Sequence, residues 1–189
     1  MSYFDFLIVV ATCSLLLFVS HCAESEERKH LYVIGDSLSS PTGCEWPREL
    51  DDQYAIHNLA QAGLTMEAFD MPHHQSFRDD STVVIMMGSN DAGSGVSVLR
   101  YKMRLRETIR AAKTRGADRV LVGGPPEIES LLPAVTKYRK AAKRVAKNER
   151  VAYFTVKWDA DQTIDGLHPT CNFNRLIADQ VRNEIERAL

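Results

Sequence analysis

Cysteine is scarce in this chain, with four among 189 residues, and no group of cysteines has the spacing of a metal site. An internal repeat is also lacking, which excludes solenoids and propellers. The formal net charge is only -2, which argues against a surface built entirely for nucleic acid. With 44% hydrophobic residues, the chain has the size and composition of one domain with a substantial core.

An almost unbroken apolar run covers residues 7–20, and a strongly polar stretch follows it. The run is shorter than the roughly 20 residues that a membrane span needs, and it suits the hydrophobic region of a secretory signal peptide. Small residues precede a cleavage point near Ala23. We therefore expect residues 1–22 to be a signal peptide and residues 23–29 a polar linker.

Lysine and arginine are absent before Arg28, although signal peptides usually begin with basic residues. An uncleaved membrane anchor is therefore the alternative to a cleaved signal peptide. A cleaved signal would make the protein secreted or periplasmic. Of the four cysteines, only Cys44 and Cys171 would then remain, and two thiols in an oxidising compartment favour one disulfide over a metal site.

Apolar, β-branched runs alternate with helical patterns along the rest of the chain. The expected strands lie at 31–34, 55–59, 82–87, 119–122 and 151–156, and the expected helices at 46–53, 96–115, 131–147 and 174–189. The third run is apolar throughout, as a strand covered on both faces should be. Strands separated by helices form right-handed βαβ units. The sequence therefore predicts a three-layer α/β domain over residues 30–189, with about five parallel strands and helices on both faces.

Polar or glycine-containing clusters follow four of these strands. They lie at residues 35–39, 58–63, 88–91 and 165–169. In open parallel sheets the functional groups gather beyond the carboxyl ends of the strands. We therefore expect the four clusters to meet at one edge of the sheet.

The residues in these clusters match the requirements of acyl transfer. Ser37 needs a base to remove its proton, and His168 is the candidate. Asp165 lies three residues before His168 and could orient its ring and stabilise the imidazolium. A tetrahedral oxyanion needs donors, and the Ser37 and Gly63 N–H groups with the Asn90 amide could supply three.

The four clusters resemble the sequence blocks of the SGNH hydrolases, the GDSL esterase/lipase family. Gly-Asp-Ser-Leu-Ser at 35–39 matches the first block, Asn58 with Gly63 and Thr65 the second, Gly-Ser-Asn-Asp at 88–91 the third, and Asp-Gly-Leu-His-Pro at 165–169 the last. The resemblance implies a flavodoxin-like sheet. It also implies the roles given above: Ser37, Asp165 and His168 as the catalytic residues, and Ser37, Gly63 and Asn90 as the oxyanion hole.

Each cluster alone has a structural interpretation. Gly-Asp-Ser is a common turn, Asp165 to His168 could be a turn entering the last helix, and Asn90 could cap the helix expected from Val96. Together, in order and at four strand ends, the clusters favour the hydrolase.

The sequence thus predicts a secreted serine esterase that hydrolyses short acyl or acetyl esters, including esters on glycans. The alternatives are a thioesterase or lysophospholipase, and a non-catalytic glycan-binding relative. We expect no cofactor, and no metal at His73 and His74, because adjacent loop histidines lack regular ligand spacing. The oligomeric state cannot be read from the sequence.

The two remaining cysteines follow the candidate nucleophile and base closely in the chain. Cys44 comes seven residues after Ser37, and Cys171 three residues after His168. Because Ser37 and His168 must touch, we expect a disulfide between Cys44 and Cys171. Two buried free thiols are the alternative.

Positive charge is concentrated in residues 100–150, which hold fifteen Lys or Arg against five Asp or Glu. Two solvated helix faces would explain this pattern. The other interpretation is a basic surface for an anionic glycan, phospholipid or cell-wall polymer. Nucleic acid is disfavoured as a partner because aromatic residues do not interleave with the charges.

Overall fold

A computed structural model of the chain describes residues 28–188. The predicted signal peptide, residues 1–22, and most of the predicted linker lie outside this range. Five strands form one parallel sheet in the order β2-β1-β3-β4-β5. They are β1 (Lys29–Gly35), β2 (Tyr54–Asn58), β3 (Ser81–Met86), β4 (Arg119–Gly124) and β5 (Ala152–Thr155). This confirms the predicted parallel sheet, and its strand order is that of flavodoxin-like folds.

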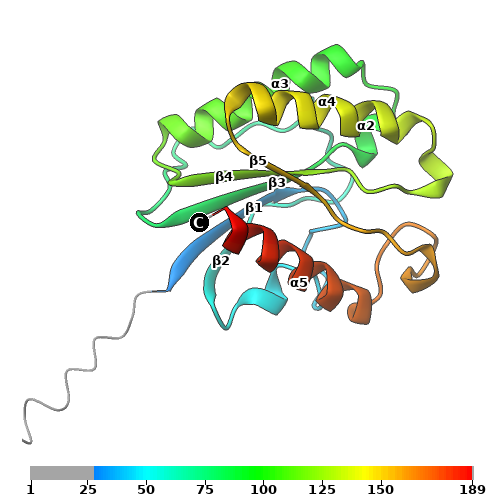
Figure 1. Ribbon diagram of the computed structural model, residues 1–189, viewed down its shortest axis with the longest axis horizontal. Helices are drawn as coiled ribbons and strands as arrows, with labels where there is room; N and C mark the ends of the chain where they lie inside the picture. Colours follow the sequence, from blue (N-terminus) through cyan, green and yellow to red (C-terminus); the bar gives the residue numbers. More distant parts are fainter. Residues whose placement is uncertain (1–27, 189) are drawn as a thin grey trace, which may run out of the picture.

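Helices cover both faces of the sheet, as predicted (Figure 1). One face carries α2 (Ser89–Gly93), α3 (Val98–Thr114) and α4 (Ala134–Glu149), and the other carries α5 (Cys171–Arg187). Short 3-10 turns complete the chain: η1 (Arg48–Leu50), η2 (Glu129–Leu131) and η3 (Ala160–Gln162). Within residues 28–188, none of the helices has the length and apolar character needed to cross a membrane.

Successive side chains along a strand point to opposite faces of the sheet, so a separate hydrophobic core forms on each face. In β1, Leu31 and Val33 pack towards α5, whereas Tyr32 and Ile34 pack towards α3 and α4. All six residues of β3 are buried, because a central parallel strand is covered on both sides. The two cores fix the sheet between the helical layers and so fix where its carboxyl edge lies.

The helix predicted at 46–53 is wrong, because only the single turn η1 forms there. Trp46 is fully buried, and its indole N–H donates to Ser39 Oγ at 2.9 Å. Its backbone N–H donates to Asn174 Oδ1 of α5 at 3.2 Å. The chain must bury Trp46 and Leu50 and then enter β2 at Tyr54, which leaves room for only one turn.

The third polar cluster forms a short helix, α2, that the sequence analysis did not predict. Asn90 lies inside α2, so it does not cap α3. Ser97 caps α3 instead, since its hydroxyl accepts a hydrogen bond from the Arg100 N–H at 3.2 Å. Strand β1 lies between β2 and β3, which the chain reaches by crossing over β1. The ends of β1 and β3 therefore form the switch point where ligands bind in such sheets.

Candidate active site

Ser37 lies at the tip of a tight turn directly after β1. The Ser39 N–H donates to the Asp36 carbonyl at 3.0 Å, and the Leu38 N–H donates to Asp36 Oδ1 at 3.0 Å. A Cβ on Gly35 would lie 2.8 Å from Ser39 Cβ, so only glycine allows this turn to pack. Asp36 and Leu38 are buried while Ser37 is partly exposed. The turn therefore presents the Ser37 side chain at the carboxyl edge of the sheet.

His168 connects Ser37 with Asp165. Its Nε2 lies 3.1 Å from Ser37 Oγ, and its Nδ1 lies 2.7 Å from Asp165 Oδ2. A carboxylate accepts hydrogen bonds, so Nδ1 carries the proton and Nε2 offers its lone pair to the serine hydroxyl. The three side chains predicted to act together do lie together, in the arrangement that activates a serine.

Asp165 is held ionised by the turn that it begins. The His168 N–H donates to its Oδ1 at 2.7 Å, and the Leu167 N–H donates to the same oxygen at 3.0 Å. These bonds, with the His168 ring, lower the pKa of Asp165 from 3.8 to about 2, the His168 N–H having the largest effect. The turn is closed by a bond from the Ile164 N–H to the His168 carbonyl at 2.8 Å. The carboxylate therefore stays ionised until the pH falls to about 2.

Gly63 follows β2 on an exposed loop and has φ of +75°. Apart from its two chain neighbours, no residue has an atom within 4 Å of the position that a Cβ would occupy. The positive φ, and not a clash with a neighbouring group, is therefore the reason for glycine here. Neither the Ser37 N–H nor the Gly63 N–H has an acceptor among residues 28–188. Both donors are thus available to a bound molecule.

Two neighbouring residues of α2 hold the Gly63 loop. Asn90 Nδ2 donates to the Leu64 carbonyl at 3.0 Å, and Asp91 Oδ2 accepts from the Met66 N–H at 2.8 Å. The side-chain amide nitrogen of asparagine carries two hydrogens, so Asn90 retains a second donor besides the one that bonds to the Leu64 carbonyl. Asn90 is therefore both a candidate oxyanion donor and a support for the loop that carries Gly63.

A disulfide joins the serine loop to the histidine loop. Cys44 and Cys171 are bonded, with their Cα atoms 5.3 Å apart and a sequence separation of 127. The predicted pairing is present in the structure. Closing so long a loop stabilises a fold by about 2–4 kcal/mol. The bond lies beside the contact between Ser37 and His168, so it restrains the two loops where they must meet.

The pocket that contains the candidate nucleophile and base has a volume of about 230 Å³. Ser37, His168 and both bonded cysteines line it, and Ile164 stands at its rim with 77% of its surface exposed. Ile164 was not among the predicted site residues. Nothing in a single sequence marks it, because its position depends on how the first and last loops pack.

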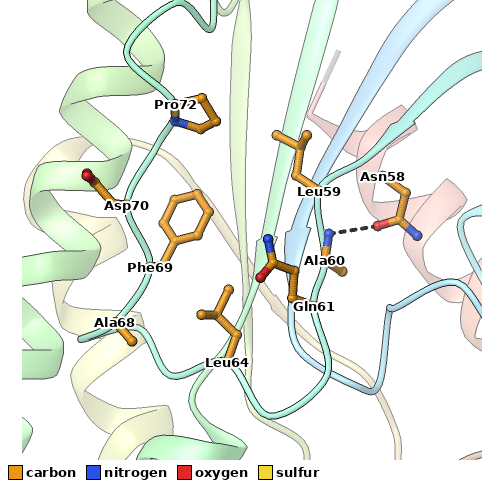
Figure 2. Close-up of a pocket in the computed structure, with 9 residues that line it drawn as sticks. All are labelled: Asn58, Leu59, Ala60, Gln61, Leu64, Ala68, Phe69, Asp70 and Pro72. Carbon is orange, nitrogen blue, oxygen red and sulfur yellow. Dashed lines mark hydrogen bonds between the residues drawn. The ribbon is translucent and has the colours of Figure 1, made fainter.

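A larger pocket, of about 440 Å³, lies beside the Gly63 loop (Figure 2). Leu59, Ala60 and Gln61 line one side of it and Phe69 and Asp70 the other, with Leu64 near one end. Neither Ser37 nor His168 lines this pocket. Although this pocket is the larger of the two, the candidate nucleophile and base line the smaller one.

Two buried carboxyl groups lie behind the site. Asp36 is only 1% exposed, and its Oδ2 has no hydrogen-bond partner within residues 28–188. Burial raises the pKa of Asp36 from 3.8 to about 7, against the lowering effect of the Leu38 N–H. Burial also raises the pKa of Asp91. The sequence pattern placed Asp36 beside the nucleophile but did not show that it is buried.

One protein family matches most of this chain. The GDSL-like Lipase/Acylhydrolase family model matches residues 33–175. A G-D-S-L family lipolytic protein from Veillonella parvula has a similar structure, with a TM-score of 0.71 and 20% identity, covering 84% of this chain and 99% of its own. No curated protein matches the chain significantly.

Two further solved structures of similar fold are esterases. The carbohydrate acetylesterase Est24 from Sinorhizobium meliloti has a TM-score of 0.63 and 17% identity, covering 86% of this chain and 100% of its own. A mutant of Axe2, an acetyl-xylooligosaccharide esterase from Geobacillus, has a TM-score of 0.67 and 17% identity. The match covers 83% of this chain and 94% of the Axe2 chain. At these identities the likeness shows a shared fold.

Replacing Asp36 by asparagine should change how stability depends on pH. Because the pKa of Asp36 is raised in the folded state, the contribution of Asp36 to the free energy of unfolding is fully present below about pH 4. It is lost as the pH rises to about 7. The full shift, from 3.8 to about 7, corresponds to about 4 kcal/mol at most. Asp36→Asn should therefore gain stability over the natural protein across this range and keep a constant advantage above it.

Urea unfolding at a series of pH values measures this difference. Asp52→Asn, at an exposed position, is the matched control and should follow the natural protein. A constant difference between Asp36→Asn and the natural protein, from about pH 4 to above pH 7, would show that Asp36 is ionised in the fold.

Proposed function

The chain belongs to the GDSL-like Lipase/Acylhydrolase family, and on this premise we propose that it is a secreted serine esterase that cleaves short acyl esters. The observation that carries the proposal is the position of His168, with one ring nitrogen 3.1 Å from Ser37 Oγ and the other 2.7 Å from Asp165 Oδ2. This arrangement gives a serine the base that it needs.

The proposed reaction has two halves. Ser37 Oγ attacks the ester carbonyl while His168 Nε2 takes its proton, and Asp165 stabilises the imidazolium. The tetrahedral intermediate collapses, the C–O bond to the alcohol breaks, and His168 returns the proton to the leaving alcohol. Water then attacks the acyl-enzyme with His168 again as base, releasing the carboxylic acid and restoring Ser37.

Negative charge develops on the carbonyl oxygen during both halves. The Ser37 and Gly63 N–H groups have no acceptor within residues 28–188, and Asn90 keeps one amide hydrogen beyond its bond to Leu64. We assign these three groups as the oxyanion hole. Donors that are already in place lower the barrier because they need no reorganisation during the reaction.

The size of the pocket supports a short acyl group. Its volume of about 230 Å³ is bounded on one side by the Cys44–Cys171 disulfide. That is below the roughly 300–1,000 Å³ typical of pockets that enclose drug-sized ligands. Two structural neighbours are a carbohydrate acetylesterase and an acetyl-xylooligosaccharide esterase. Both observations favour acetyl esters, including those on glycans. Faster turnover of long-chain acyl thioesters than of acetyl esters would instead indicate a thioesterase.

Ser37→Ala should lower the turnover of p-nitrophenyl acetate by about 10³-fold or more while the fold is kept. His168→Ala should lose a similar amount, and the double variant should lose little more, because the two residues act in one step. Steady-state kinetics with an unfolding curve for each variant measures this. Full activity in folded Ser37→Ala protein would end the esterase proposal.

Asn90→Ala should lower kcat by roughly 10²- to 10³-fold with a much smaller change in KM, because its amide would act on the transition state. Asp91→Asn is the matched variant, since an asparagine oxygen can still accept from the Met66 N–H, and it should lose far less. If Asn90→Ala raised only KM, Asn90 would be a residue that binds the ground-state substrate.

We propose export from the cytoplasm because the disulfide accords with an oxidising compartment and the apolar run at residues 7–20 suits a signal peptide. The protein recovered outside the cytoplasm should lack residues 1–22 and contain no titratable thiol. Mass spectrometry with and without a thiol reagent measures both. An intact amino terminus would support the anchor alternative, and two free thiols would contradict the disulfide.

A further inference from the structure

A groove lined by cations lies between α3 and α4. Lys102 of α3 stands on one side, and Lys137, Lys140 and Arg144 of α4 on the other. Val98 and Ala141 complete the lining, and no carboxylate belongs to it. The volume of this basic groove is about 160 Å³.

The cations of the basic groove differ from the arginines around them. Arg104 pairs with Glu107 at 2.9 Å, and Arg110 pairs with Glu149 at 2.9 Å. Arg100 and Arg139 also contact carboxylates, those of Glu67 and Glu127. In the part of the chain that the structure describes, none of the four groove cations has an ion pair or a side-chain hydrogen bond. Their charge is not used to hold the fold, and an anionic partner would relieve their mutual repulsion.

Two exposed apolar side chains lie on α3 next to residues that line the basic groove. Leu99 is 65% exposed and Met103 is 48% exposed. They lie one helical turn apart on α3 and adjoin Val98 and Lys102 in the chain. A single exposed apolar residue needs no explanation. A pair of them beside unpaired cations is the arrangement of a lipid-surface site, where cations bind anionic head groups and apolar side chains enter the acyl boundary.

The basic groove begins near the edge of the sheet that holds the active site. Helix α3 starts five residues after α2 ends, and α2 carries Asn90. The Tyr138 hydroxyl of α4 donates to the Val96 carbonyl just before α3. Leu132, which is 46% exposed, precedes α4 at the same edge. The end of the groove at Val98 and Lys137 therefore lies towards the carboxyl edge of the sheet.

We propose that the basic groove, together with Leu99 and Met103, docks the protein on an anionic phospholipid surface. This goes beyond the proposed esterase activity and does not depend on it. A soluble polyanion could satisfy the four cations, but it would give the exposed side chains of Leu99 and Met103 nothing to contact. The membrane accounts for both features.

Lysine acetylation of the full chain tests the proposal. Vesicles of phosphatidylcholine with phosphatidylglycerol should slow the acetylation of Lys102, Lys137 and Lys140 by roughly fivefold. A factor of that size is the increase in membrane affinity that one basic residue gives near an anionic membrane. Exposed Lys157, after β5, is the internal control and should be unaffected. Because the comparison is made within one chain, attachment through the amino terminus cannot produce the difference.

Variants and alternative ligands separate the explanations. The double variant Leu99→Ser with Met103→Ser should reduce the protection, whereas Leu176→Ser, which removes an exposed leucine from α5, should not. Equal protection of Lys157, equal protection by pure phosphatidylcholine vesicles, or no effect of the double variant would overturn the proposal. Dextran sulfate protecting the three lysines while anionic vesicles do not would overturn it in favour of a polyanionic glycan.

Discussion

The hydrogen bond between Ser37 Oγ and His168 Nε2 joins loops that are 131 residues apart in the chain. It can form only if β1 and the segment before α5 end at the same edge of the sheet. The Cys44–Cys171 disulfide restrains the two loops beside this contact. The Asp165 carboxylate accepts hydrogen bonds from the His168 backbone N–H and from the His168 ring, and so holds the ring in place. The two cores and the loop bonds therefore serve one requirement, which is that the serine meets its base at about 3 Å.

The same edge carries polar groups that a stability-optimised core would avoid. Asp36 and Asp91 are buried, and each has one oxygen without a partner among residues 28–188. An unsatisfied buried polar group costs about 1–3 kcal/mol. The other oxygen of each carboxyl accepts a backbone N–H, from Leu38 and Met66 respectively. These bonds hold the serine turn and the Gly63 loop in place. The two buried carboxyl groups therefore lower the stability of the fold but maintain the geometry of the site.

Much of this arrangement could be predicted because it is encoded locally. The fully apolar third run predicted a strand covered on both faces, and the polar clusters at strand ends predicted where Ser37 and His168 would meet. The single turn at η1 was not predictable, because the burial of Trp46 against α5 decides it. Helix α2 and the bond from Asn90 to Leu64 likewise depend on packing between distant segments. Periodicity and motifs record local preference, whereas these features result from tertiary contacts.

The most direct measurement is covalent trapping of the nucleophile with a fluorophosphonate ester. An activated serine attacks phosphorus and expels fluoride, leaving a stable adduct on its oxygen. Mass spectrometry of the digested protein should place one adduct on Ser37 and show that His168→Ala sharply reduces it. Continued ester hydrolysis with no adduct on Ser37, or with the adduct on another residue, would contradict the account.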